Sequence, residues 1–226
     1  MNVWSNYSRA ICLPDNCGCE LVDLDHLIAQ PSAFWSSLFH LFFAALLYFN
    51  VKENSQSLKL WTLSLIILGL SSHFAHGSFL EFAMAMDFAG IILVLSFFAL
   101  YKSLVKWVSS TPKIIFLLLS FQVGLWMTFY SLEKWFKLGL CLIFFFISMV
   151  ELMHTEGKAF WKAKELHLAL GILGISFVFF MLDELKMVCN PNSWFTGHSI
   201  WHFGTALALY FYGRWRFRID ANIPFI

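Results

Sequence analysis

Charged side chains are scarce in this sequence. Only 13% of its 226 residues are Asp, Glu, Lys or Arg, whereas a soluble domain contains about 25%. Such a deficit excludes a soluble globular enzyme, a disordered chain and a coiled-coil or collagen-like fibre. The few charges nearly cancel, with a formal net charge of +1. A nucleic-acid partner therefore has no electrostatic support.

Internal repeats, low-complexity tracts and long linkers are also lacking. A transporter usually contains repeats or broken helices, so their absence disfavours that class. Residues 1–33 lack the positively charged start and apolar run of a cleaved signal peptide. We expect this polar segment to form a small cap outside the membrane.

Apolar side chains are abundant instead. They make up 59% of the chain, and the mean hydropathy is +0.70. A membrane-spanning helix needs about 20 apolar residues, and seven stretches approach that length: 34–51, 60–79, 83–101, 114–132, 138–153, 166–182 and 196–212. The sequence therefore predicts an all-α membrane protein with a seven-transmembrane helix bundle. Its expected parts are the cap (1–33), the membrane domain (34–215) and a short cytoplasmic tail (216–226).

The basic residues predict the orientation of the bundle. Four of the 15 lie on the N-terminal side of the predicted spans, and eleven lie on the other side. Lys and Arg concentrate in cytoplasmic loops. We therefore expect a multi-pass protein with its C-terminus in the cytoplasm and its N-terminus in the periplasm or a lumen.

Two pairs of polar residues stand out inside the spans. Ser72 and His76 are four residues apart in the second span, and His198 and His202 are four apart in the seventh. Residues at this spacing share one face of a helix, and two such histidines can bind one metal ion, as in helix-borne zinc sites. His73 is an alternative ligand, but its angular offset of about 60° from the Ser72 face favours His76.

The predicted topology brings these residues to one depth. His76 lies near the end of the second span, Asp87 near the start of the third, and His198 and His202 in the first two turns of the seventh. Three histidines with one open position form a catalytic zinc sphere. Asp87 could then orient a histidine or serve as the general base. Other polar residues at or in the spans are expected to be structural or interfacial: His40, Glu151, His154, His167, Asp183 and Glu184.

These residues resemble those of a known family. Ser72 is followed after three residues by His76 and after ten more by Asp87, and the pair His198 and His202 follows near the end. This order is similar to that of the alkaline ceramidases, which belong to a superfamily of seven-span hydrolases with the adiponectin and progestin receptors and the GPI-lipid remodelling hydrolases. Further similar segments are Cys19-Glu20, Ile28-Ala29-Gln30-Pro31, Asp183, Cys189 and Gly197-His198-Ser199-Ile200-Trp201-His202.

The resemblance implies a chemistry. Zinc would be held by His76, His198 and His202, with Asp87 as the general base on the attacking water and Ser72 as the stabiliser of the oxyanion. The substrate would be a ceramide or related N-acyl lipid, which is cleaved to a sphingoid base and a fatty acid. Such an enzyme is an integral membrane protein with a lipid partner, and the sequence identifies no protein partner.

The N-terminal cap carries two further expectations. Four cysteines fall on the non-cytoplasmic side, and of their three pairings the resemblance favours Cys19–Cys189; the fifth, Cys141, lies inside a span. Eukaryotic alkaline ceramidases hold calcium in this segment, but Gly18, Val22 and Gln30 depart from that pattern. A Ca²⁺ site is therefore doubtful here, although oxygen donors remain at Asp15, Glu20, Asp23 and Asp25.

Two other functions remain open from the residues alone. A lipid esterase of the same superfamily could use the same site, because an activated water also attacks esters. A seven-span receptor with a structural zinc site is the second alternative. The presence of Asp87 and Ser72 beside three histidines favours an enzyme, because structural zinc sites are usually closed by four protein ligands.

Overall fold

The computed structural model describes residues 6–10, 18–50, 56–107, 111–130 and 132–220. Within these segments the chain forms eight α-helices and no extended strand, which confirms the all-α class. The helices are α1 (Pro31–Asn50), α2 (Gln56–Ser78), α3 (Glu81–Trp107), α4 (Thr111–Tyr130), α5 (Lys134–Glu156), α6 (Lys158–Lys162), α7 (Lys164–Glu184) and α8 (Gly197–Asp220).

Four of these helices are long and apolar enough to cross a membrane. They are α1, the Leu58–Ser78 part of α2, α5 and α7, and α4 contains a shorter apolar segment, Ile115–Tyr130. Many large apolar side chains lie on the outside of the bundle, among them Phe116 on α4, Phe146 on α5 and Val178 on α7. An apolar exterior of this kind suits lipid rather than water, so the chain has the character of a multi-pass membrane protein.

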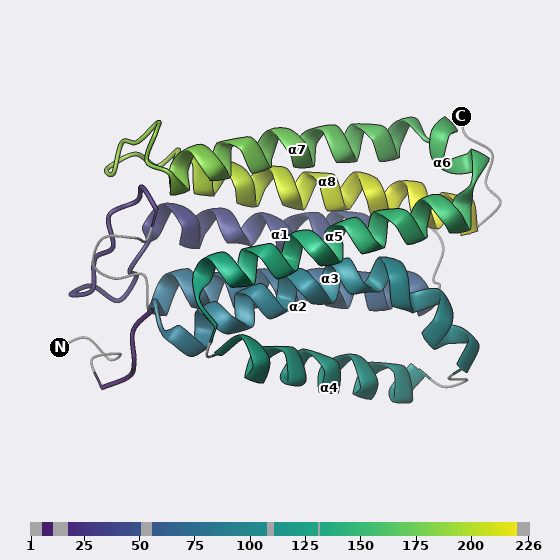
Figure 1. The fold of residues 1–226 in the computed structure, drawn as a ribbon, viewed down its shortest axis with the longest axis horizontal. Helices are drawn as coiled ribbons and strands as arrows, with labels where there is room; N and C mark the ends of the chain where they lie inside the picture. Colours follow the sequence, from purple (N-terminus) through teal and green to yellow (C-terminus); the bar gives the residue numbers. More distant parts are fainter. Residues whose placement is uncertain (1–5, 11–17, 51–55, 108–110, 131, 221–226) are drawn as a thin grey trace.

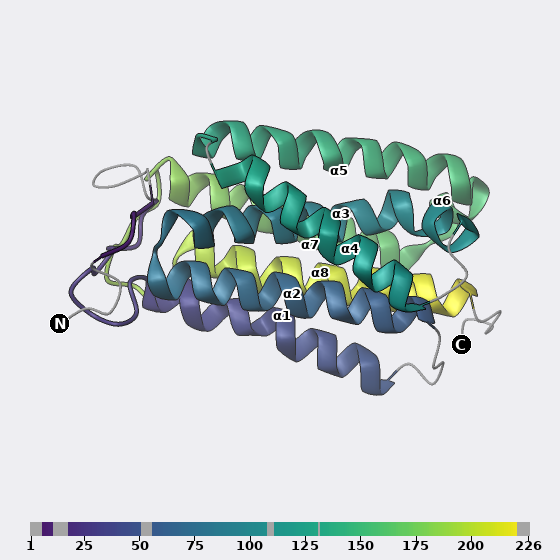
Figure 2. The same ribbon diagram turned by 90° about the horizontal axis from the view of Figure 1, so that it is seen from below.

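The long helices run up and down in an antiparallel bundle (Figures 1 and 2). Helix α2 lies in the middle, packed against α1, α3 and α8. On one side α4 and α5 pack against α3, and on the other α7 packs against α8. The core between these helices includes fully buried Leu47, Trp61 and Trp215. At Gly213 a Cβ atom would come within 2.6 Å of Leu47 Cδ2, so a glycine is needed where α8 crosses α1.

The helix boundaries differ from the predicted spans at two places. Helix α8 continues to Asp220, through residues that we expected to begin the tail. A short helix, α6, lies between α5 and α7, where Gly157 adopts a φ of 52° that is accessible to glycine at little cost. Neither feature has an apolar pattern long enough to be predicted from the sequence.

The cap is attached to the end of α2 by backbone hydrogen bonds. Gln30 N–H donates to the carbonyl of His76 at 3.0 Å, and Ala29 N–H donates to that of Gly77 at 3.0 Å. The last carbonyl groups of a helix have no partner within it, so the cap satisfies groups that α2 leaves free. The polypeptide before α1 is therefore fixed directly beside His76.

Glu20 determines where α1 begins. Its carboxylate accepts hydrogen bonds from the N–H groups of Ser32 at 2.5 Å and Ala33 at 3.1 Å. Pro31 suits the first helical position because its φ angle is already helical. Burial raises the pKa of Glu20, while the two N–H groups partly offset that increase. The negative charge at a helix N-terminus is stabilised by the helix dipole, so α1 starts three residues before the expected span.

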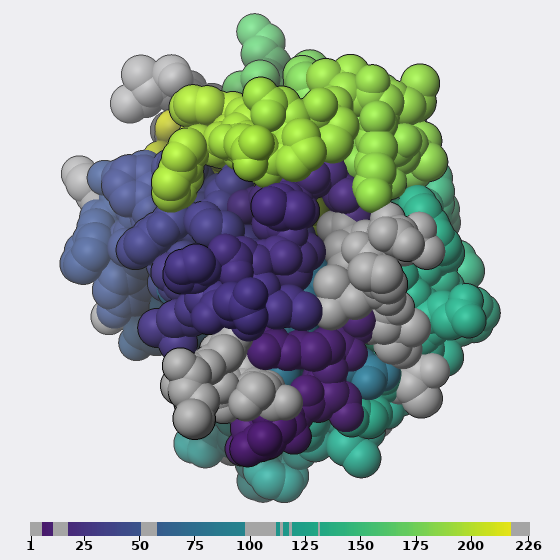
Figure 3. All heavy atoms as spheres, turned by 90° about the vertical axis from the view of Figure 1, so that its left-hand side faces the viewer, coloured from purple at the N-terminus to yellow at the C-terminus, as the bar shows by residue number. Residues whose placement is uncertain are grey.

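The structure contains the Cys19–Cys189 disulfide, as the resemblance implied; Cys12 and Cys17 lie outside the described residues. The bond joins the cap to the loop between α7 and α8. Figure 3 shows the cap and this loop side by side over one end of the bundle. Cys19 N–H also donates to Asp183 Oδ2 at 3.0 Å, which adds a second link between the cap and α7.

We expect the Cys19→Ser variant to unfold more readily than the wild-type protein. Loss of a native disulfide typically costs ~2–5 kcal/mol, and this one closes a loop with a sequence separation of 170. Denaturant unfolding in detergent micelles measures the change. Cys141→Ala, at the free buried cysteine, is the control for loss of a thiol. Equal unfolding midpoints for Cys19→Ser and wild type would contradict the expectation.

Candidate metal centre

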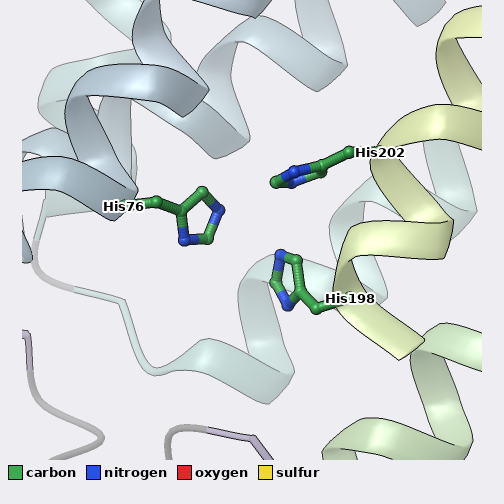
Figure 4. Close-up of side chains that lie close together, drawn as sticks. All are labelled: His76, His198 and His202. Atoms are coloured by element: carbon green, nitrogen blue, oxygen red, sulfur yellow. The ribbon is translucent and has the colours of Figure 1, made fainter. Parts of the chain in front are cut away.

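Three histidines from two helices meet near the capped end of the bundle. The rings of His76, His198 and His202 face one another (Figure 4), with centroids 4.7 to 4.9 Å apart. One nitrogen from each ring lies within 4.8 Å of the others. His76 and His202 are buried, and His198 is 17% exposed. These three residues form a group that could hold a metal ion.

Helix ends position the three side chains. His76 lies in the last turn of α2, while α8 begins at Gly197 and carries His198 and His202 in its first two turns. The common depth expected from the topology is therefore confirmed. Gly197 allows α8 to start close to α7, because a Cβ there would lie 2.7 Å from Asp183 Cβ.

The outward nitrogens of two of these rings are fixed by hydrogen bonds. His76 Nδ1 lies 2.8 Å from Gln30 Oε1. His202 Nδ1 lies 3.0 Å from the carbonyl of Ala33 and 3.0 Å from Ser36 Oγ. When Nδ1 donates to such an oxygen, the lone pair is on Nε2, which is how metal-binding histidines are usually oriented.

The inward atom of His76 gives a direct test of the fit to a metal. His76 Nε2 is buried and has no hydrogen-bond partner. A buried nitrogen without a partner is costly, and a metal ion would remove that cost. Three imidazole nitrogens are a donor set typical of catalytic zinc. The residues present therefore fit the ion that the sequence predicted.

Asp87 and Ser72 lie beside the histidines. Asp87 Oδ2 is 4.0 Å from His76 Nε2, and the side chain is 14% exposed. Ser72 Oγ is 3.4 Å from His202 Nε2 and is also a hydrogen-bond partner of Asp87. All five residues singled out in the sequence are thus close together, with one carboxylate and one hydroxyl next to the inward ring nitrogens of His76 and His202.

Two other histidines, His73 on α2 and His40 on α1, have different surroundings. His73 Nδ1 contacts the carbonyl of Phe34 at 2.9 Å, and its ring lies against the Phe34 ring. His40 contacts the carbonyl of Ser37 through Nδ1 and Thr205 Oγ1 through Nε2, both at 3.2 Å. Neither belongs to a candidate metal group among the described residues, which agrees with the preference for His76 and with a structural role for His40.

Asp183 and Glu184 were expected to be interface charges, and this prediction is wrong. They are only 1% and 9% exposed, because the cap covers the end of α7. Glu184 Oε2 contacts the ammonium group of Lys134, and its Oε1 lies 3.7 Å from His198 Nδ1. An ion pair thus links α5 to α7 next to the third histidine.

Two of the oxygen donors considered for calcium, Glu20 and Asp23, already accept hydrogen bonds. Both carboxylate oxygens of Glu20 accept from α1. Asp23 accepts hydrogen bonds from His26 and from the backbone of Asp25 and His26, and the His26 contact is the main reason that the pKa of Asp23 is lowered. Asp15 lies outside the described residues. Among the residues placed by the structure, no candidate cation group contains Glu20, Asp23 or Asp25.

Gln30 contacts His76, and the sequence did not predict this contact. We expect Gln30→Ala to weaken metal binding about 10- to 100-fold, the usual effect of removing a group that orients a metal-binding histidine. Gln30→Glu restores an acceptor and is expected to recover most of the affinity. Competition with a chelator of known zinc affinity measures both. An unchanged affinity in Gln30→Ala would show that the 2.8 Å contact does not orient His76 for binding.

Comparisons of the chain with protein-family models, with curated proteins and with solved structures find no match. The likeness to the alkaline ceramidases is therefore a hypothesis that depends on the dispersed motif residues. A functional conclusion has to come from the geometry of the site and from its chemistry.

Proposed function

We propose that this protein is a zinc-dependent intramembrane amidase that hydrolyses ceramide or a related N-acyl lipid to a sphingoid base and a free fatty acid. The observation that carries this proposal is the meeting of His76, His198 and His202 beside Asp87 and Ser72. Metal donors, a carboxylate and a hydroxyl are the groups that hydrolysis of an amide requires.

A zinc ion held by the three histidines would polarise the substrate carbonyl and lower the pKa of water toward ~7. Asp87 would take the proton of the attacking water, and the distance of 4.0 Å between its carboxylate and the inward nitrogen of His76 supports this role. The same proton must then reach the leaving nitrogen, because an amine anion is a very poor leaving group. Asp87 can carry out both transfers from one position.

Ser72 has a separate role in the proposal. Its hydroxyl is 3.4 Å from His202 Nε2 and contacts Asp87, so it lies at the same inner edge of the cluster. A hydroxyl at this position can donate a hydrogen bond to the oxygen on which charge develops as the carbonyl is attacked. Asp87 and Ser72 would therefore act on the nitrogen and oxygen sides of the same amide.

The surroundings of the site support a lipid substrate. The helices α1, α2, α5 and α7 are candidate membrane spans, and α3, α4 and α8 would complete the seven-span bundle predicted from the sequence. The outer faces of α5 and α7 carry apolar side chains such as Phe136 and Phe179. A molecule with long acyl chains could reach the site from the bilayer. The resemblance to the alkaline ceramidases favours an N-acyl sphingoid among such molecules.

Product analysis tests the proposal against its alternatives. Purified protein loaded with zinc is incubated separately with an N-acyl sphingoid and with a diacyl phospholipid, and the released lipids are identified by mass spectrometry. We expect a sphingoid base and a fatty acid from the first substrate. Fatty acid from the phospholipid alone would identify a lipid esterase. No hydrolysis of either by zinc-loaded protein would favour a receptor with a structural zinc site.

The proposed topology yields a prediction of its own. With eleven of the 15 basic residues on one side of the spans, the positive-inside rule places the C-terminus in the cytoplasm. A C-terminal fusion to green fluorescent protein is expected to fluoresce in a bacterial host, and a fusion to alkaline phosphatase is expected to be inactive. The reverse pair of results would contradict the orientation.

A further inference from the structure

A second group of metal-binding side chains lies next to the three histidines. Asp183, Glu184 and His198 each offer one ligand atom, and these atoms lie within 4.8 Å of one another. The two carboxylates are the last residues of α7, and His198 is in the first turn of α8. The junction of these helices beneath the cap therefore gathers two oxygen donors and one nitrogen donor.

The two nitrogens of His198 face different neighbours. One nitrogen of the ring points toward His76 and His202 (Figure 4), while Nδ1 lies 3.7 Å from Glu184 Oε1. This separation is too long for a good hydrogen bond. Two atoms bound to one ion by bonds of about 2.0–2.2 Å can, however, be up to roughly 4 Å apart. The separation of 3.7 Å is that of a long ion pair, and it also allows an ion bound to both atoms.

One oxygen of the group has no hydrogen-bond partner. Asp183 is only 1% exposed, and its Oδ1 atom is buried without a hydrogen-bond partner. Lys134 contacts Oε2 of Glu184, which leaves Oε1 facing His198. The two adjacent buried carboxylates thus face one lysine and one histidine. A buried carboxylate oxygen without a partner is costly, and a cation bound to Asp183 Oδ1 would remove this cost.

Gly18 leaves room for such an ion. Its φ is +89°, and a Cβ atom there would lie 3.1 Å from Asp183 Oδ2 and 3.3 Å from Glu184 Oε1. Any other residue would crowd both carboxylates and would also be strained. The cap therefore crosses Asp183 and Glu184 at a residue without a side chain. This leaves space next to their carboxylate oxygens on the side that faces the cap.

We propose that Asp183, Glu184 and Nδ1 of His198 bind a second divalent cation of the zinc class. His198 would be shared between the two metal sites as an imidazolate, because binding the second ion displaces the remaining N–H proton to solvent. Carboxylate oxygens and an imidazole nitrogen are a donor set that zinc and manganese accept. The second ion would hold the end of α7 to the start of α8 and would fix the ring of His198 from its outer side. This inference does not depend on which bond the protein cleaves.

Metal content of matched variants tests the second site. The full-length protein in detergent is stripped with a chelator, titrated with zinc and desalted, and the zinc per chain is measured by elemental analysis. We expect about two equivalents in the wild type and about one in Asp183→Asn. Asparagine keeps an oxygen that can accept from Cys19 N–H, so the link to the cap survives. Asp23→Asn, at an exposed acid of the cap, is the control and is expected to retain two equivalents.

His76→Ala separates the two sites. It removes a ligand of the histidine site alone and is expected to leave about one equivalent of zinc. The double variant His76→Ala/Asp183→Asn should lose this equivalent too. The second site would be overturned if the wild type bound only one equivalent of zinc and if that equivalent were lost in His76→Ala but kept in Asp183→Asn. The histidine centre would then stand. The wild type could instead bind one equivalent of zinc that is lost in Asp183→Asn and kept in His76→Ala. That result would support the second site and overturn the proposed function.

Discussion

Replacement of Asp87 by asparagine is expected to leave the metal bound and to remove most of the turnover. Asn has the same shape but cannot take a proton from water. General acid–base groups contribute typically ~10²–10⁴-fold to a rate, and the proposed reaction uses Asp87 twice. Metal binding should persist because the three histidines supply the ligands and the carboxylate is 4.0 Å from His76 Nε2.

Zinc content and amide cleavage have to be measured on the same preparation. Ser72→Ala is expected to lose ~10²–10³-fold, the usual contribution of one oxyanion donor, and also to keep its zinc. Glu81→Gln changes an acid in the first turn of α3, the helix that carries Asp87. This variant is the control and should behave like wild type. Near-normal cleavage by a zinc-loaded Asp87→Asn protein would leave Asp87 with a structural role and would break the mechanism.

Removal of two histidines is expected to abolish both zinc binding at the histidine centre and hydrolysis. In the double variant His198→Ala/His202→Ala only His76 remains of the three ligands, and one imidazole binds zinc weakly. His198 also belongs to the second group, so we expect no zinc to remain on the chain. The loss of activity should reach the background rate, because the substrate carbonyl and the water both lose their activating ion.

A matched histidine provides the control for this experiment. His73 is on α2 three residues before His76 and contacts the carbonyl of Phe34. His73→Ala is expected to retain its zinc, although its stability will fall because the ring packs against Phe34. Full zinc occupancy in the His198→Ala/His202→Ala protein would show that the metal is bound elsewhere, and the assignment of the ligands would fail.

Most of the helices could be predicted because apolar runs in a membrane chain have a length set by the bilayer. Their ends could not, because they depend on contacts between segments distant in sequence. Helix α1 starts at Pro31 since Glu20 reaches its N–H groups from the cap. Helix α6 is a different case, because it begins directly after Gly157, whose positive φ is a local feature. Neither feature leaves a periodic pattern that sequence reasoning could read.

The meeting of the three histidines was predictable for a similar reason. The i, i+4 spacing of His198 and His202, and the hairpin that returns from His76 to Asp87, are local features that fix depth and face. Gln30 and Glu184 were not recognised as neighbours of the site. They reach His76 and His198 only because the cap folds over α2 and because α7 and α8 meet beneath it. Partners supplied by tertiary contact alone have no sequence signature.

The distribution of the three histidines along the chain also bears on biosynthesis. His76 is made early, whereas His198 and His202 are among the last 30 residues of the 226. Chains are synthesised from the N-terminus, so a nascent chain has one ligand of the histidine centre until α8 leaves the ribosome. Cys189, the partner of Cys19, also emerges only near the end. Assembly of the histidine group and covalent closure of the cap are therefore late events, and a chain that stalls before Gly197 cannot bring the three histidines together.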